Sequence, residues 1–342
     1  MHSEPKIHCN NIWKLFGSHP ERTLKTIDRA ASRAEIQEST GHVVAVRDVS
    51  FAVQEGETFV VMGLSGSGKS TLVRCLSRLI DPTDGQVLIN NNDITRVSQR
   101  ELKDLRRHKM AMVFQHFGLF PHRTVLDNVA YGLEVRGEKR ESRLAKAMEF
   151  IDLVGLDGWA NHYPRELSGG MQQRVGLARA MAVEPEILLF DEPFSALDPL
   201  IRREMQDELL GLQARLQKTM VFITHDFLEA IKMGDHIMIL RDGAISQMGT
   251  PEEIVANPTD RYVADFTEDV PKYKVLSAGK VMVPANGVVV NSANTVPESA
   301  KIESLIDLVA DTDEPLGVVD TSGSVVGMID RAVIMKAINS KI

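Results

Sequence analysis

The sequence is poor in cysteine, in aromatic residues and in long apolar runs. Its 342 residues include two cysteines, Cys9 and Cys75, which excludes a disulfide framework and favours a reducing, cytoplasmic setting. No uncharged apolar stretch reaches the roughly 20 residues that a membrane-spanning helix needs, and the N-terminus carries no recognisable secretion signal. We therefore expect any role at a membrane to depend on a partner.

Positive charge is also scarce, because 39 Lys and Arg residues face 47 Asp and Glu residues and leave a formal net charge of −8. This balance argues against a nucleic-acid partner held through phosphate contacts. The rest of the composition, 43% hydrophobic and 25% charged, is ordinary for a globular protein. The length suits one large domain with a small one attached.

A glycine-rich stretch with one lysine is the most informative feature that is present. Residues 63–71 fit the phosphate-loop pattern G-x-x-x-x-G-K-[ST], follow the apolar run 58–62 and open a helical segment, Ser70 to Leu79. This setting distinguishes a phosphate loop from a Gly/Ser-rich turn without a ligand. The glycines let successive N–H groups cradle an anion at a helix N-terminus. The expected nucleotide-binding residues are Gly63, Leu64, Ser65, Gly66, Ser67, Gly68, Lys69, Ser70 and Thr71.

Within this loop, Lys69 is expected to reach the β- and γ-phosphates and Ser70 to hold Mg²⁺. A pair of acids, Asp191 and Glu192, ends the apolar run 187–190. Asp191 is placed to bind Mg²⁺ through its water shell, and Glu192 to act as general base toward the attacking water. An Asp-Glu pair alone could simply end a strand, but the apolar run and the upstream phosphate loop favour the catalytic interpretation.

Two further polar residues, Gln115 and His225, each follow an apolar strand-like run. Singly, each could be an ordinary loop residue. Together with the phosphate loop they form a set, in which Gln115 would touch Mg²⁺ or orient the water and His225 would hydrogen-bond the γ-phosphate. Strands that alternate with helices predict a mainly parallel α/β sheet with its ligand at the carboxyl ends of the strands.

The chain order contains several expected elements outside this sheet. Residues 6–16 indicate an edge strand, and the polar residues 17–41 indicate a mostly helical insertion. We expect residues 43–53 and 58–62 to pair as antiparallel strands. A hairpin is expected around Arg241-Asp242-Gly243, with a type I′-like turn.

The stretch Leu167-Ser168-Gly169-Gly170-Met171-Gln172 precedes an amphipathic helical run, and by itself Ser-Gly-Gly could be a helix cap. With the other motifs it resembles the signature of ABC (ATP-binding cassette) ATPases. The resemblance covers about residues 6–265 and follows the family's motif order. That order comprises the phosphate loop, Gln115, the signature, residues 187–192, the segment Ser195 to Asp198 and His225.

This resemblance implies an α/β ABC ATPase with a mainly parallel core sheet, an antiparallel β-subdomain and a helical signature subdomain at about residues 116–183. It implies ATP and Mg²⁺ as cofactors and a homodimer of cassettes. The signature of one subunit, including Ser168, Gly169, Gly170 and Gln172, would close over ATP held by the other, and Asp198 would tie the two sites together. The adenine would stack on Phe16, with Trp13 as the alternative.

Residues 193–202 and 206–209, and the insertion itself, resemble the ATP-binding subunits of quaternary-amine importers. Such a subunit energises import of glycine betaine, proline betaine, choline or carnitine from the cytoplasmic face of the inner membrane. Its partners would be a permease, contacted near Phe117 to His122, and an extracytoplasmic solute-binding protein. The alternatives are the ATPase of another ABC importer, for amino acids or polyamines, and a non-transport ABC ATPase.

Composition changes near Val270, so we expect a cassette over residues 1–268 and a small domain over 269–342. The small domain contains a predicted hairpin, residues 316–329, followed by a helix. It resembles only the last strand–turn–strand–helix part of a CBS module. A regulatory or dimerisation role is expected for it.

Overall fold

The computed structural model of the chain describes residues 4–115, 118–284, 294–310 and 314–339. The chain divides into two compact units, Met1–Ile245 and Ser246–Ile342, which are described separately. This division falls earlier than the predicted boundary between cassette and small domain, at residues 268 and 269. The predicted boundary concerns functional domains and stays a prediction.

A four-stranded sheet in the first unit has the order β2-β1-β4-β5, and its neighbouring strands run antiparallel. Its strands are β1 (Ile7–Phe16), β2 (Val43–Val53), β4 (Asp84–Ile89) and β5 (Asn92–Asp93). The prediction that residues 6–16 form an edge strand is wrong, because β1 pairs with β2 on one side and β4 on the other. Alternation of side chains reports the two faces of a strand but not its neighbours within the sheet.

A six-stranded sheet has the order β10-β9-β3-β8-β7-β6, and the β9-β3, β3-β8, β8-β7 and β7-β6 pairs are parallel. Its strands are β3 (Thr58–Met62), β6 (Met110–Val113), β7 (Ile187–Asp191), β8 (Thr219–Thr224), β9 (His236–Arg241) and β10 (Ala244–Gly249). The mainly parallel sheet is thus confirmed. Between β9 and β10, Asp242 and Gly243 both have positive φ, as the predicted type I′ turn requires.

The predicted antiparallel pairing of residues 43–53 with 58–62 is wrong. β3 lies between β8 and β9 and is parallel to both. Every residue of β3 is buried, which is typical of an interior strand in a parallel sheet covered on both faces. β2 and β3 instead belong to different sheets, and Phe51 of β2 stacks on Phe59 of β3 with ring centroids 4.9 Å apart.

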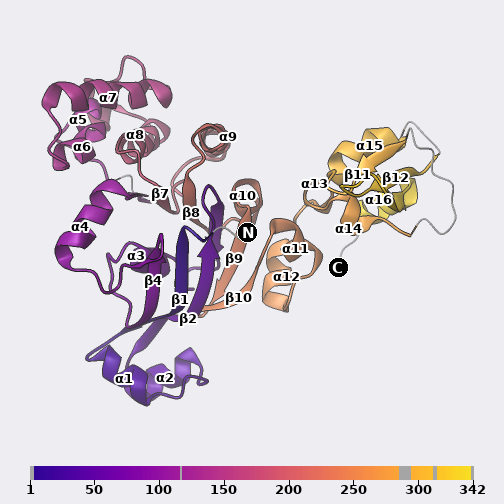
Figure 1. The fold of residues 1–342 in the computed structure, drawn as a ribbon, viewed down its shortest axis with the longest axis horizontal. Helices are drawn as coiled ribbons and strands as arrows, with labels where there is room; N and C mark the ends of the chain where they lie inside the picture. The colour runs from indigo at the N-terminus through magenta and orange to yellow at the C-terminus, as the bar shows by residue number, and fades with distance from the viewer. Residues whose placement is uncertain (1–3, 116–117, 285–293, 311–313, 340–342) are drawn as a thin grey trace. The chain divides into compact units, whose positions relative to one another are not determined.

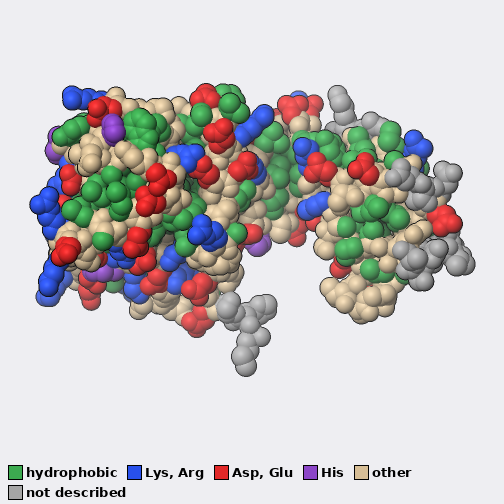
Figure 2. Space-filling view, turned by 90° about the horizontal axis from the view of Figure 1, so that it is seen from above, with side chains coloured by type: hydrophobic (Ala, Val, Ile, Leu, Met, Phe, Trp, Pro, Cys, Tyr) green, Lys and Arg blue, Asp and Glu red, His purple; other side chains and the backbone are tan. Residues whose placement is uncertain are grey.

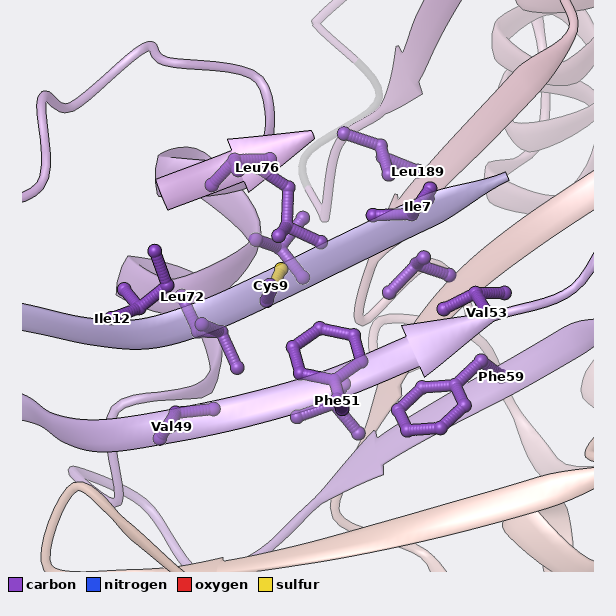
Figure 3. Close-up of a cluster of buried hydrophobic side chains, with 14 of the residues drawn as sticks. Ile7, Cys9, Ile12, Val49, Phe51, Val53, Phe59, Leu72, Leu76 and Leu189 are labelled. Atoms are coloured by element: carbon purple, nitrogen blue, oxygen red, sulfur yellow. The ribbon is translucent and has the colours of Figure 1, made fainter. Parts of the chain in front are cut away.

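The main hydrophobic core lies between these two sheets and around α3 (Lys69–Leu76). Figure 3 shows Leu72 and Leu76 of α3 beside Cys9 of β1, with Phe51 and Phe59 in the neighbouring strands. Burial raises the pKa of the Cys9 thiol well above its usual range and that of Cys75 to about 12. Both cysteines therefore serve as small apolar side chains that fix α3, and with it the phosphate loop, against the sheets.

Apart from α3, the helices of the first unit fall into three groups. Two of them, α1 (Pro20–Thr26) and α2 (Arg33–Thr40), form the predicted insertion and lie together beyond one end of β1 and β2 (Figure 1). A helical subdomain contains α5 (Val125–Val129), α6 (Tyr131–Val135), α7 (Arg140–Leu153) and α8 (Gly169–Ala182), with the short 3₁₀ helix Pro164–Glu166. The remaining helices are α4 (Gln99–His108), α9 (Pro199–Leu216) and α10 (Phe227–Met233).

The second unit contains six helices and a three-stranded sheet of order β11-β12-β13 among its described residues. The β11-β12 pair is parallel and the β12-β13 pair is the predicted hairpin. Its elements are α11 (Pro251–Ala256), α12 (Arg261–Thr267), α13 (Lys272–Val275), α14 (Ala278–Val281), β11 (Thr295–Pro297), α15 (Ile302–Ala310), β12 (Leu316–Val319), β13 (Val325–Ile329) and α16 (Arg331–Asn339).

The β11-α15-β12-β13-α16 order contains more than the expected strand–turn–strand–helix fragment. The CBS-like character of this part stays a prediction.

Across the described ranges, we find no helix long and apolar enough to cross a membrane. Acidic and basic side chains are interspersed over the face drawn in Figure 2 rather than separated by sign.

Candidate nucleotide site

The predicted site residues follow four strands that are neighbours in the six-stranded sheet. β3 leads into the phosphate loop, β8 into His225, β7 into Glu192, and β6 is followed by Gln115. Because these strands are parallel, their carboxyl ends meet at one edge of the sheet. The topology alone therefore gathers residues that are far apart in the sequence.

The phosphate loop holds glycine where a side chain would collide. A Cβ on Gly63 would lie 2.3 Å from the carbonyl oxygen of Leu240, and one on Gly68 would lie 2.2 Å from that of Ala45. Both glycines have positive φ, and Gly68 is the N-cap of α3. At Gly66, by contrast, an added Cβ would meet nothing within 4 Å. The loop is thus packed tightly against the fold at two points and open between them.

The Lys69 side chain lies within the turn of this loop. Its Nζ donates hydrogen bonds to the carbonyl oxygens of Gly63 at 2.8 Å and Leu64 at 3.1 Å, and lies 3.8 Å from Glu192 Oε1. Burial lowers the pKa of Lys69, while the carboxylates of Glu192 and Asp191 act in the opposite direction. An ammonium group that is partly removed from water attracts a polyanion more strongly than an exposed one.

Ser70 and Asp191 meet at the start of α3. Ser70 Oγ donates to Asp191 Oδ1 at 2.7 Å, and Arg74 Nη2 lies 3.4 Å from Asp191 Oδ2. Asp191 is buried, and these two partners satisfy the hydrogen-bonding capacity of its carboxyl group. A serine hydroxyl beside a carboxylate is an oxygen donor set that fits Mg²⁺, which takes few protein ligands and completes its shell with water and phosphate.

Glu192 lies between Lys69 and His225. Its Oε2 is 3.2 Å from His225 Nδ1, and its Oε1 faces Lys69 Nζ. The backbone of Glu192 has φ +48°, in the left-handed region that residues other than glycine rarely adopt. This conformation ends β7 abruptly and turns the carboxylate toward the phosphate loop.

Gln115 is tied to the segment that follows Glu192. Its Nε2 donates to Ser195 Oγ at 3.2 Å, and Ser195 Oγ donates to the carbonyl oxygen of Glu192 at 3.0 Å. The amide of Gln115 is therefore connected through one serine to the backbone of the proposed base.

Lys69, Ser70, Gln115 and Glu192 line one cavity of about 460 Å³, whereas Asp191 and His225 do not line it. Phe16 lies at this cavity and its side chain is 42% exposed, whereas Trp13 is 1% exposed within a hydrophobic cluster. Phe16 is thus the better placed of the two aromatic rings to stack a base. The cavity is lined by Phe16, Arg33, Val43, Ala45, Ser65, Gly66, Gly68, Lys69, Ser70, Thr71, Gln115 and Glu192.

The signature residues do not line this cavity. Ser168 is the N-cap of α8, and its Oγ accepts a hydrogen bond from the Met171 N–H at 3.3 Å. Ser168 and Gly169 are exposed, whereas Gly170 is buried. A Cβ added at Gly170 would lie 2.6 Å from Ile201 Cγ2, so this position has no room for a side chain. The helix-cap interpretation of Ser-Gly-Gly therefore holds for this chain, and an exposed helix N-terminus remains available beside it.

Two other predicted residues have local structural roles in this chain. Gln172 Nε2 donates to the carbonyl oxygens of Pro164 at 3.1 Å and Leu167 at 3.2 Å, so it braces the loop before α8. Asp198 is the N-cap of α9, its Oδ1 accepts from two backbone N–H groups, and its side chain is exposed. Neither residue lines the cavity.

The predicted permease segment, Phe117 to His122, is described only in part, because His116 and Phe117 lie outside the described residues. Buried Asn128 receives the N–H of Phe120 and donates to three carbonyl oxygens of residues 120–124. The Phe120 ring packs on Tyr131 with centroids 4.5 Å apart. This segment is thus anchored to the helical subdomain.

Three residues at the site were missed by sequence reasoning. Arg33, Val43 and Ala45 line the cavity. The last two follow from the register of β2 on β1, and no motif marks Arg33.

The fold and site together define a P-loop ATPase of the ATP-binding cassette class. The sequence pattern of the family described as "ABC transporter" matches residues 46–195. The chain is 53% identical to the trimethylamine N-oxide transport system ATP-binding protein TmoW of Ruegeria pomeroyi, over 96% of this chain and 95% of the relative. It is 51% identical to the glycine betaine/proline betaine transport system ATP-binding protein ProV of Escherichia coli, over 93% of this chain and 79% of the relative.

A solved dimeric structure of a post-hydrolysis state of the ATP-binding cassette MJ0796, bound to ADP and Pi, has a TM-score of 0.61 and 33% identity. The alignment covers 72% of this chain and 98% of the MJ0796 chain. The chain therefore belongs to the ABC transporter family, among the ATP-binding subunits of quaternary-amine importers.

Proposed function

We propose that this chain is the ATP-hydrolysing subunit of an importer and energises uptake of a quaternary amine or of trimethylamine N-oxide. The observation that supports this most strongly is the convergence of Lys69, Ser70, Asp191, Glu192 and His225 at one sheet edge. Three of them line a single cavity with the glycine loop.

In this proposal, ATP would supply the phosphoryl group to be transferred, and Mg²⁺ would neutralise part of its charge. The loop N–H groups and Lys69 bind the phosphates, and Ser70 and Asp191 hold the ion. Glu192 would accept the proton of the water that attacks the γ-phosphorus, while the bond from this phosphorus to the β,γ-bridging oxygen breaks and ADP leaves. His225 would orient the Glu192 carboxylate through the 3.2 Å contact between its Nδ1 and Glu192 Oε2. Its other ring nitrogen, Nε2, would bind the γ-phosphate.

A second copy of the chain is part of the proposal. Ser168 and Gly169 expose a helix N-terminus that lies outside the chain's own cavity, so it is available to cover ATP held by a partner. The dimeric cassette among the solved neighbours supports this arrangement. We further propose that the pair docks peripherally on a permease at the cytoplasmic face of the membrane, in a system with a solute-binding protein. Residues 269–342 would regulate or dimerise.

An apolar groove of about 300 Å³ is the site we assign to the permease. It lies between α6, β6 and the end of α4. Tyr131 and Arg179 line it and also contact the predicted segment 117–122. Leu79, Phe114 and Val135 line it and are 50%, 38% and 38% exposed. Large apolar side chains gathered at one exposed place indicate a protein interface. A short cytoplasmic helix of the permease is the occupant that an importer subunit requires.

The Leu79→Asp variant should abolish co-purification of the chain with its permease, because a carboxylate in the groove would be desolvated without a partner. The ATPase activity of the isolated variant should stay near that of the wild type. Leu308, which is 52% exposed in the second unit, gives the matched control Leu308→Asp. Equal permease recovery for the two variants would contradict the assignment.

Trimethylamine N-oxide is the first solute to test. The match to TmoW covers 95% of that relative, whereas the match to ProV leaves about a fifth of ProV uncovered. A quaternary amine such as glycine betaine is the second candidate. A third class, amino acids or polyamines, shares the catalytic residues and is not favoured by any observed feature.

Uptake in cells that produce this chain with its neighbouring permease and binding protein tests the proposal. Labelled trimethylamine N-oxide, glycine betaine, choline and proline should be compared against a Lys69→Ala control. We expect uptake of at least one of the first two, lost in the control. If none of the four is taken up while ATPase activity is intact, the solute class is wrong and the ATPase assignment still stands.

A further inference from the structure

The α1–α2 insertion brings an arginine into the nucleotide cavity. Arg33 is the first residue of α2, and its Nη1 donates to the carbonyl oxygen of Gly66 at 3.0 Å. The same side chain lines the cavity with Phe16 and Lys69. A segment outside the recognised motifs thus forms one wall of the site.

A hydrophobic cluster fixes the insertion to the sheet. Leu24 of α1 and Ile36 of α2 are buried against Trp13, Leu15 and Val44 of β1 and β2. Because apolar burial of this kind stabilises by about 25 cal/mol per Å², the insertion is a packed part of the first unit rather than a loose appendage.

Polar contacts then set its position. His42 is buried, and its ring nitrogens lie 2.9 Å from the carbonyl oxygen of Thr40 and 2.8 Å from that of Ser18, which joins the two ends of the insertion. Arg29 Nη2 is 3.2 Å from Asp84 Oδ2, and Arg47 Nη2 donates to the Arg29 carbonyl oxygen at 2.7 Å. The insertion is therefore held at both ends and, through Arg29, in the middle. α2 begins with Arg33, a few residues after Arg29.

Within the part of the chain that the structure describes, the charge on Arg33 has no acidic partner. Among the described residues, Arg33 makes one hydrogen bond, to a backbone carbonyl, and forms no ion pair with a carboxylate. The nearby Glu35 is engaged in a capping box with Ser32. A guanidinium carries five N–H donors and suits phosphate oxygens, so most of its donors remain uncommitted beside the phosphate loop.

We propose that Arg33 is a nucleotide-binding residue, whose guanidinium supplies positive charge to the phosphate chain of ATP from the insertion side of the cavity. This inference rests on the proposed function. Arg33 contacts the loop at Gly66, where an added Cβ would meet no atom within 4 Å. The guanidinium charge therefore lies at a part of the phosphate loop that the other described residues do not cover.

Equilibrium binding of ATP to the full chain, measured by titration calorimetry, tests this. Arg33→Ala should weaken ATP binding by about five- to tenfold, and Arg33→Lys should restore most of the loss. The loss should shrink as salt rises from about 0.05 M to 0.5 M, because screening weakens a charge contact. Arg22, an exposed arginine in the same insertion, gives the matched control Arg22→Ala.

Two results would overturn the inference. One is an ATP affinity of Arg33→Ala equal to that of Arg22→Ala. The other is a loss that Arg33→Lys does not restore and that salt does not change, which would mean that Arg33 only supports the Gly66 carbonyl. Lys69→Ala, measured in parallel, separates this inference from the proposed function, since unaltered binding in Lys69→Ala would sink the latter.

Discussion

At the scale of single residues, Glu192 shows how the backbone positions a catalytic group. A left-handed φ on a glutamate costs on the order of 1 kcal/mol and persists only where the surroundings impose it. Here the hydrogen bond from Ser195 Oγ to the Glu192 carbonyl and the contact with His225 do so. The strain is located where the carboxylate must face the phosphate loop.

The sequence makes some of these residues predictable and leaves others hidden. Asp191, Glu192 and His225 could be predicted because each lies at the carboxyl end of a buried apolar strand, and parallel strands present these ends together. Arg33 could not, since its place beside Gly66 depends on how a polar insertion packs on β1 and β2. An arginine in a polar helix carries no local signal of that packing.

A substitution at Gly169 tests the signature without disturbing the fold. A Cβ there would meet only Leu197 Cδ2, at 3.7 Å, so Gly169→Ala should fold normally. Its methyl group would stand on the exposed surface that we assign to the partner's ATP. We expect ATP turnover to fall roughly tenfold or more in a steady-state assay.

Gly211 in α9 provides the control for this change, because an added Cβ there also has open space. Gly211→Ala should leave turnover unchanged. Unchanged turnover in Gly169→Ala would show that this surface does not approach a nucleotide.

At the scale of elements, the helices were easier to predict than the strand partners. The helical segments of the insertion follow from capping residues and apolar spacing, which are local signals. The predicted neighbours of β1 and β3 are wrong, because strands pair through backbone hydrogen bonds that any sequence can form. The side chains of a strand therefore do not specify which strand lies beside it. Continuous burial of β3 was visible in its apolar run and could have indicated an interior parallel strand.

The capping box of α2 gives a prediction with a defined pH dependence. Hydrogen bonds with the Ser32 side chain and backbone lower the pKa of Glu35. A lowered native pKa stabilises the helix above the unfolded value, and this contribution is lost as pH falls through the native value. We expect Glu35→Gln to speed amide hydrogen exchange across α2 at neutral pH and to match the wild type once the pH lies well below the native pKa of Glu35.

Exchange rates corrected for their intrinsic pH dependence provide the measurement. Glu38→Gln is the control, because Glu38 lies exposed on the same helix. A difference between Glu35→Gln and wild type that is constant with pH would contradict the ionic capping role.

At the scale of the whole molecule, the chain holds a phosphate loop and a signature that do not share a cavity. Two copies arranged head to tail would pair each loop with the other's signature. The match to TmoW spans 96% of this chain and therefore extends into the second unit. The regulatory or dimerisation role that we propose for it would not involve the nucleotide site, so the motifs of that site carry no information about it.

The Glu192→Gln variant tests most directly whether ATP joins two cassettes and is hydrolysed by this base. Without a base, bound ATP should persist, so sedimentation should show a dimer with ATP and a monomer with ADP. Turnover should fall about a hundredfold or more. The double variant with Lys69→Ala should stay monomeric. A Glu192→Gln chain that remains monomeric with ATP and keeps its turnover would contradict both the base and the shared site.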